Sequence, residues 1–136
     1  MEIRGKIFKD GKFWLADIPE LDLIIQSTTK KKMPEMVKDA IELLVDNPSF
    51  EVDVKSTKDN LLFINSNDIK LLTALFLKRQ RQKNNLRLED VANNLKAKSI
   101  NEYAQYEQAK HMPSIEQIQR FLDAIDPSRE KYPIWI

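Results

Sequence analysis

Hydrophobic and polar residues alternate along most of the first half of the chain, which predicts strands. Ile3, Gly5 and Ile7 share one face, and the turn sequence at residues 10–12 is typical of a hairpin leading into a second strand. Later segments are rich in β-branched residues or alternate again with charged ones. The predicted strands are residues 2–9, 13–18, 23–28 and 50–55, with residues 61–64 as a candidate fifth.

One segment inside this region changes to a helical period of 3.6 residues. Its apolar positions form a single stripe, and Pro34 is acceptable there only in the first turn, so the helix is expected to start near Met33 and to stop at Asn47-Pro48. The stripe consists of Met33, Met36, Val37, Ala40, Ile41 and Leu44. The first half is therefore predicted to fold as β-β-β-α-β, with the helix covering one face of the sheet.

From residue 67 onward the helical period persists. A helix capped by Ser66 or Asn67 is expected to end at Lys83. Further helices are expected from Leu88 to Leu95, from Ser99 to about Gln108, and from Pro113-Ser114 to a stop at Asp126-Pro127. The last of these should turn Ile115, Ile118, Leu122 and Ile125 inward. The fold class is predicted as α+β, with one domain at residues 1–66 and an all-α domain at residues 67–136. The second domain ends in an apolar tail that we expect to pack on the domain or on a dimer mate.

Charge is nearly balanced over the whole chain, at +1, but it is unevenly distributed. Residues 78–110 carry 8 Lys and Arg against 4 Asp and Glu, which favours a modest phosphate-facing surface in the second domain. The run Lys30 to Lys32 precedes a helix and is more simply explained as a solvated loop. The chain has no cysteine, one histidine (His111) and no apolar run long enough for a membrane span or a signal peptide. A cytoplasmic location without membrane association is the default expectation.

The segment from residue 88 to residue 107 has the apolar spacing of a helix-turn-helix. The contact between its two helices is expected to involve Val91, Ala92, Leu95, Ile100 and Tyr103. Ser99 is expected to cap the second helix, whose N-terminus would then be open to phosphate. Asn85 is suited to the left-handed conformation that follows many helix ends.

The helix-turn-helix residues belong to four sequence runs that resemble those of a known family. The runs Leu77-Lys-Arg-Gln-Arg81, Leu86-x-Leu-Glu-Asp-Val-Ala-x-x-Leu95, Ser99-x-x-x-Tyr-x-x-x-Glu107 and Pro113-Ser-x-x-x-Ile-x-x-Phe-Leu122 resemble a Cro/phage-repressor-type helix-turn-helix domain, which implies five helices. The resemblance implies that Asn101, Glu102 and Gln105 face base edges in the major groove. It further implies that phosphates are held by Lys98, Ser99, Tyr106 and Lys110. Three positions depart from the family pattern. Arg87 and Leu88 replace a capping hydroxyl and a phosphate-gripping glutamine, so Arg87 would make the phosphate contact or the contact would be lost. Ala109 replaces a glycine.

The first half resembles a HicB-type antitoxin through Phe13-Trp-Leu-Ala-Asp-Ile-Pro-Glu-Leu21, Ser27-Thr-Thr29 and the helical run Val37-Lys-Asp-Ala-Ile-Glu-Leu-Leu44. That resemblance implies a truncated ribonuclease-H-like domain that covers the active site of a small HicA-type ribonuclease toxin. It also implies that the second domain binds operator DNA and represses the operon. A single helix-turn-helix offers a small interface, so a homo-oligomer, either dimer or tetramer, is expected on palindromic half-sites.

Two other functions remain open from the sequence. The chain could be a solitary transcriptional regulator whose first domain only dimerises or senses a ligand, or an interaction module whose helix-turn-helix has lost DNA. An enzyme is not expected, because the acids Asp10, Asp17, Glu20 and Asp22 have the spacing of ordinary turn residues and not of a two-metal site. We therefore predict no catalytic residue, no cofactor and no bound metal.

Overall fold

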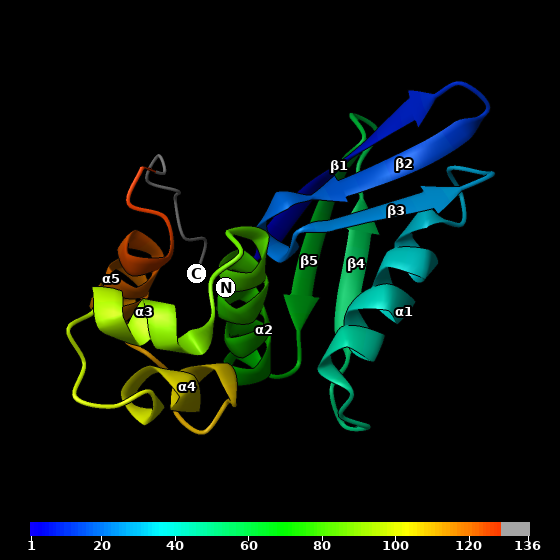
Figure 1. Cartoon of the computed structure of the whole chain (residues 1–136). Coiled ribbons are helices and arrows are strands. Elements are labelled where there is room, and N and C mark those ends of the chain that lie inside the picture. The colour runs from blue at the N-terminus through cyan, green and yellow to red at the C-terminus, as the bar shows by residue number, and fades with distance from the viewer. Residues whose placement is uncertain (129–136) are drawn as a thin grey trace. The chain divides into compact units, whose positions relative to one another are not determined.

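The computed structural model describes residues 1–128 and divides the chain into two compact units (Figure 1). The first unit begins at Met1 and ends at Ile69, and the second begins at Lys70. The apolar tail that the sequence singled out, with Tyr132, Ile134 and Trp135, lies outside the described residues.

A single antiparallel sheet of five strands forms the first unit. Its strands are β1 (Ile3–Asp10), β2 (Phe13–Ile18), β3 (Leu23–Ser27), β4 (Val52–Ser56) and β5 (Leu61–Ser66), in the spatial order β3-β2-β1-β5-β4. A short 3-10 helix, η1 (Pro19–Leu21), connects β2 to β3, and helix α1 (Met33–Val45) connects β3 to β4. Because β3 and β4 are the two edge strands, α1 connects the two edges of the sheet, and it packs mainly against these two strands (Figure 1).

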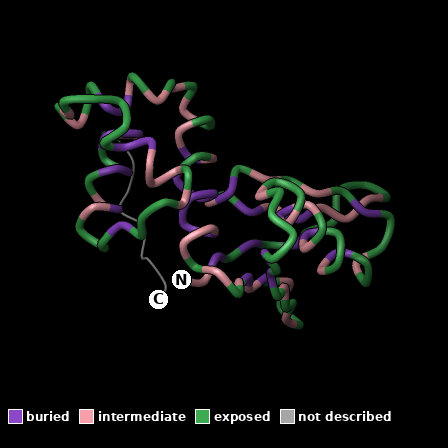
Figure 2. Tube along the Cα trace, turned by 90° about the horizontal axis from the view of Figure 1, so that it is seen from below, coloured by how far each residue is buried: buried purple, intermediate pink, exposed green. Residues whose placement is uncertain are grey.

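The period-2 alternation of the sequence corresponds to an alternation of buried and exposed positions along the strands (Figure 2). On β1, Ile3 and Ile7 are buried whereas Arg4, Lys6 and Phe8 are exposed. The buried face is covered by α1, which contacts β2, β3 and β4 and contributes Met33, Val37 and Ile41, all at 0% exposure. Met36 and Leu44, which the stripe assigned to the core, are 36% and 37% exposed, so the buried stripe is narrower than predicted.

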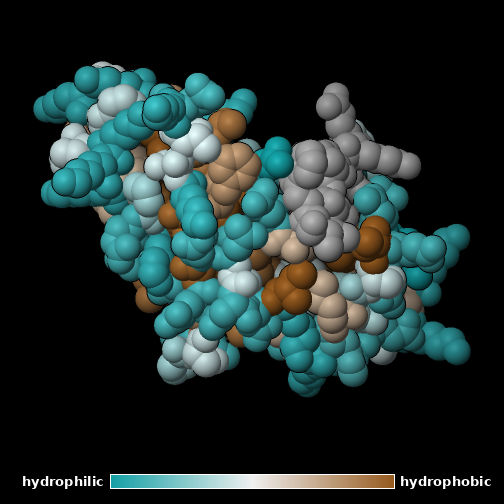
Figure 3. All heavy atoms as spheres, turned by 180° about the vertical axis from the view of Figure 1, so that it is seen from behind, coloured by the Kyte–Doolittle hydropathy of each residue, from teal (hydrophilic) through white to brown (hydrophobic). Residues whose placement is uncertain are grey.

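The other face of the sheet presents apolar side chains to solvent. The strand register places Phe8, Leu15, Ile24 and Leu61 on the face opposite α1. Phe8 is 43% exposed and Ile24 is 65% exposed. Figure 3 shows that hydrophobic residues lie between hydrophilic ones on the surface of the molecule.

The predicted fold class is wrong in its arrangement, although the chain is α+β. The first unit is not a β-β-β-α-β domain of truncated ribonuclease-H-like type, because the segment from Leu61 to Ser66 is a full fifth strand and α1 is interleaved between strands of one sheet. That strand pairs with both β1 and β4, so sheet pairing on both sides stabilises a segment whose own apolar run is only four residues long. The helical part also differs, because among residues 67–128 four helices follow the sheet and not five.

Gly5 is required by a close approach within the sheet. A Cβ atom at this position would lie 2.8 Å from the carbonyl oxygen of Asp17 and 2.9 Å from Cγ1 of Ile18. Such distances force the neighbouring strand to shift, and only a residue without a side chain avoids this. Gly5 therefore sets the close packing between β1 and β2.

The second unit consists of α2 (Ile69–Lys83), α3 (Leu88–Asn94), α4 (Asn101–Glu107) and α5 (Ile115–Ile125). Ser114 caps α5 by accepting a hydrogen bond from the backbone N–H of Gln117, as a serine before an apolar run predicts. Ile118, Leu122 and Ile125 are buried as predicted, but Ile115 is 52% exposed and does not belong to the core.

Three successive helices of this unit end in the same way, without glycine. The residues that follow α2, α3 and α4 in left-handed conformation are Asn85, Lys96 and Ala109, with φ between 57° and 59°. In each case the next residue donates its N–H to a carbonyl five residues back, as from Ala97 to Ala92 at 3.0 Å, which is the Schellman arrangement. The prediction for Asn85 is confirmed. The turn after Glu107 also forms, although alanine at residue 109 is strained there.

Candidate nucleic-acid interface

Helices α3 and α4 pack against each other around small and aromatic side chains. Val91 and Tyr103 are fully buried and Ala92 is 3% exposed, so the small residue at 92 lies in the packed interior of the pair. Tyr103 also makes an edge-on contact with Phe121 of α5, with ring centroids 5.1 Å apart. Burial raises the pKa of Tyr103 strongly, so its hydroxyl stays neutral. Ile100, predicted to join this contact, is instead 46% exposed.

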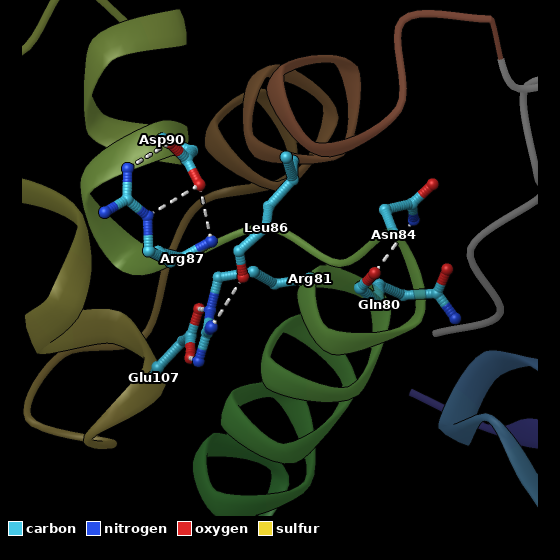
Figure 4. Close-up of polar contacts among 7 residues, drawn as sticks. All are labelled: Gln80, Arg81, Asn84, Leu86, Arg87, Asp90 and Glu107. Atoms are coloured by element: carbon cyan, nitrogen blue, oxygen red, sulfur yellow. Dashed lines mark hydrogen bonds and ion pairs between the residues drawn. The ribbon is translucent and has the colours of Figure 1, made fainter.

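A buried ion pair joins the end of α2 to the end of α4 (Figure 4). Arg81 donates from Nε to Glu107 Oε2 at 2.8 Å and from Nη2 to Oε1 at 2.9 Å, and its Nη1 donates to the carbonyl of Leu86 at 2.9 Å. The two side chains are 13% and 6% exposed. The hydrogen bonds to Glu107 raise the pKa of Arg81, so the guanidinium stays charged. The pair fixes the C-terminal end of α4 to the loop before α3.

The three residues expected to read bases lie on the first turns of α4. Asn101 and Glu102 are exposed, and Gln105 is half-buried with its Nε2 donating to the carbonyl of Glu102 at 3.3 Å. Gln105 lies four residues after Asn101 and three residues after Glu102, and residues at these spacings are neighbours on the surface of a helix. The structure therefore brings the three together on the side of α4 opposite Tyr103 and Ala104, which are buried.

The residues expected to hold phosphates fall into two groups. Lys98, Ser99 and Lys110 are exposed on the segments that enter and leave α4. The predicted capping role of Ser99 is wrong, because α4 begins two residues later, its N-cap is Ile100 and no side chain caps it. The turn conformation at residues 99 and 100 closes instead through the backbone, where the carbonyl of Ser99 accepts from the N–H of Glu102 at 3.3 Å.

Tyr106 is held by α5 and is not a freely projecting side chain. Its ring lies 5.0 Å from that of Phe121, and its hydroxyl oxygen accepts a hydrogen bond from Nε2 of Gln117 at 3.0 Å. The hydroxyl hydrogen remains available for donation to an anion, since a phenol both donates and accepts.

Arg87 is engaged by acids of its own helix. It occupies the N-cap of α3, where its N–H donates to Asp90 at 2.8 Å and its guanidinium donates to the same carboxylate at 3.2 and 3.3 Å. Glu89 lies 3.8 Å from Nη1. The hydrogen bonds to Arg87 lower the pKa of Asp90. A phosphate at this position would therefore compete with Asp90 for the guanidinium.

Sequence reasoning missed the role of Arg81 and Glu107. In the sequence, both residues stand out only as positions in the runs that resemble a helix-turn-helix domain. A signal existed, because apolar residues precede Arg81 through most of α2 and Glu107 falls four residues after the buried Tyr103. Sequence spacing alone does not show that two such residues, 26 positions apart, meet.

Among residues 1–128, no helix is both long enough and apolar enough to cross a membrane. Within the same residues, no three His, Asp or Glu side chains gather in a way that would hold a metal ion. A comparison with known protein-family models finds no match, and a comparison with curated proteins finds none either.

Proposed function

We propose that this chain is a repressor that binds duplex DNA through α3 and α4, and that it is the antitoxin of a type II toxin-antitoxin system. The observation that supports DNA binding is the shared outward face of Asn101, Glu102 and Gln105 on a helix anchored by a buried ion pair. Asparagine and glutamine amides match the edge of adenine, and a carboxylate accepts from the amino group of cytosine.

Charge around this face is suited to a duplex. Lys98 and Lys110 flank α4 in sequence and are exposed, and no carboxylate lies within 4.0 Å of either among the described residues. Glu102 opposes phosphate, so its place on the reading face is favourable only where it meets a base. We therefore expect modest nonspecific affinity and a clear preference for one sequence.

The experiment is a gel-shift or anisotropy titration of the full chain against the DNA upstream of its own gene. Replacing Asn101→Ala together with Gln105→Ala should weaken specific binding by about 1 to 3 kcal/mol for each lost base contact. The matched control, Gln26→Ala with Asn65→Ala, removes the same residue types from exposed positions of the sheet and should leave binding unchanged. Equal affinity of the two double variants for the specific site would eliminate the assignment of the reading face.

The toxin-binding part of the proposal rests on the resemblance to HicB-type antitoxins. It is supported by the face of the sheet opposite α1, where Phe8, Ile24 and Leu61 are exposed between charged side chains such as those of Lys6 and Lys55. Exposed apolar side chains on one surface mark protein interaction sites. Co-purification with the product of an adjacent gene that encodes a small protein with a single catalytic histidine tests this part.

The exposed apolar residues Phe8, Ile24 and Leu61 also favour the alternative, a solitary regulator whose first unit dimerises. Ile24→Lys distinguishes the two. Loss of the small partner with an unchanged oligomeric state indicates toxin binding, whereas conversion of an oligomer to a monomer with no partner present indicates dimerisation.

If the chain is an antitoxin, toxin occupancy should change operator affinity through linkage. Equal operator affinity with and without the toxin would remove that coupling.

A further inference from the structure

One end of the sheet in the first unit gathers lysines around two aromatic rings. The end is formed by the β1–β2 hairpin and by the segment between β3 and α1, which the register places side by side because Lys9 pairs with Trp14 and Trp14 pairs with Ser27. The five lysines that we call the hairpin-end cluster are Lys9, Lys12, Lys30, Lys31 and Lys32.

Two of these cations contact the ring of Trp14. The ammonium nitrogen of Lys9 lies 5.6 Å from the centroid of the Trp14 ring, and that of Lys30 lies 5.7 Å from it. On the neighbouring residue, Lys12 lies 5.7 Å from the ring of Phe13. Each ring attracts its cation, and the like charges gathered at this end of the sheet repel one another. An anion bound among the lysines would relieve that repulsion.

The loop that carries Lys30 is held in a defined turn. The hydroxyl of Ser27, which is 5% exposed, accepts from the N–H of Thr29 and donates to the carbonyl of the same residue at 2.8 Å. The N–H of Met33 then donates to the carbonyl of Lys30 at 3.1 Å. The turn therefore fixes the backbone from which the side chain of Lys30 reaches Trp14.

No member of the cluster has a carboxylate within 4.0 Å among residues 1–128, whereas Lys38 and Lys55 of the same unit each form an ion pair. Asp10, at the tip of the hairpin, is the acid nearest in sequence to Lys9 and Lys12. The charge of the cluster is thus left for an external partner. This result changes the interpretation of Lys30 to Lys32, which the sequence favoured as an ordinary solvated loop.

We propose that the hairpin-end cluster binds single-stranded nucleic acid, with the lysines on successive phosphates and the ring of Trp14 available to a base. Phe13 and Trp14 are consecutive on β2 and point to opposite faces of the sheet, so the ring of Phe13 lies on the other face. The ring of Trp14 is half-buried, so it is anchored in the sheet and still has exposed area. Cations that follow a backbone beside an aromatic platform favour a single strand over a duplex, whose bases are already stacked. An acidic protein segment would use the cations but would lack the regular series of bases that stack.

The inference is independent of the proposed helix-turn-helix function, because it concerns another unit and another form of nucleic acid. Fluorescence anisotropy of a labelled oligothymidylate, about 20 nucleotides long, is measured with the full chain. With three to five phosphates neutralised, doubling the salt concentration should weaken binding by roughly 4- to 10-fold.

The test variant is Lys30→Gln with Lys31→Gln, and the control is Lys6→Gln with Lys55→Gln. Both remove two positive charges from the same unit, and the control residues lie on the face of the sheet opposite α1. The test pair should weaken strand binding roughly tenfold and the control pair less than twofold, while both variants keep the affinity of the parent for operator duplex.

Three results would overturn the proposal. The first is an equal affinity for the oligothymidylate in the test variant and the control variant. The second is that a nonspecific duplex of the same length binds as tightly as the single strand or more tightly, and that the test variant weakens this duplex binding. The third is displacement of the strand by polyglutamate at an equal concentration of charges, which would assign the cluster to an acidic protein. Loss of operator binding by the Asn101 and Gln105 variant, with strand binding intact, would separate the two functions.

Discussion

Breaking the buried ion pair between Arg81 and Glu107 gives the sharpest test of how the second unit is held together. Glu107→Leu removes both carboxylate oxygens and leaves a guanidinium that is only 13% exposed with one remaining acceptor, the carbonyl of Leu86. Arg81→Met with Glu107→Leu removes both charges and fills the site with apolar side chains of similar size. The two variants separate the cost of an orphaned charge from the net contribution of the pair.

The magnitude follows from the hydrogen bonds. Glu107→Leu loses two charge-assisted bonds, each worth about 1.5 to 3 kcal/mol, so a destabilisation of roughly 3 to 5 kcal/mol is expected. Glu107→Gln keeps one acceptor and should cost about half as much. The double variant should fall within about 1 kcal/mol of the parent, because an apolar replacement of a buried pair is often nearly neutral.

The assay is urea unfolding followed by circular dichroism at 222 nm, with the free energy obtained from the midpoint at constant slope. Operator titrations of the same variants report whether α4 keeps its position. If the double variant loses as much stability as Arg81→Met alone and Glu107→Leu alone added together, the side chains act independently and the reasoning from a coupled buried pair is refuted. A Glu107→Leu cost below about 0.5 kcal/mol would refute it as well, since that is the range of an ordinary surface change.

Three further predictions concern single positions. Ala109→Gly should stabilise the second unit by up to about 1 kcal/mol in urea unfolding, because φ at residue 109 is 58° and glycine adopts that conformation without strain. Gly5→Ala should destabilise the first unit by about 1 to 3 kcal/mol in the same assay, because its Cβ would overlap the carbonyl of Asp17. The hydrogen bond from Lys38 lowers the pKa of Glu42, so this carboxylate stabilises the fold above its ordinary pKa of 4.5 and the gain is lost as the pH falls through the lowered value. Glu42→Gln should therefore flatten the acid limb of a stability-against-pH curve.

Matched controls accompany these changes. Ala97→Gly lies just after the left-handed Lys96, where φ is not positive, and should not stabilise. Gly11→Ala meets nothing within 4 Å but has φ of +60°, so it should cost only the backbone strain of about 1 kcal/mol. Stabilisation by Ala97→Gly equal to that of Ala109→Gly, or an equal cost at both glycines, would contradict the conformational reasoning. A Glu42→Gln variant with an unchanged acid limb would contradict the pH argument.

Much of the local structure follows from the sequence because it depends on neighbours in the chain. The alternation of Ile3, Gly5 and Ile7, the proline in the first turn of α1 and the serine cap of α5 act over a few residues, and the structure contains all of them. The conformation of Asn85 belongs to the same class. The sequence does not predict which apolar residues at the margin of a helix face are buried, and Met36 and Ile115 are exposed for this reason. Periodicity shows which residues share a face, but it does not show how much of that face the rest of the protein covers.

By itself the sequence determined where the period changes, where most of the strands and helices lie, and which polar residues share the outward face of α4. Only the tertiary structure decided that Leu61 to Ser66 is a full strand between β1 and β4, that Arg81 meets Glu107, and that Lys9 and Lys30 share the ring of Trp14. The physical reason is the same in the three cases. Strand pairing, ion pairing and cation–aromatic contact depend on distances between residues far apart in the chain, and hydrophobic periodicity carries no information about those distances.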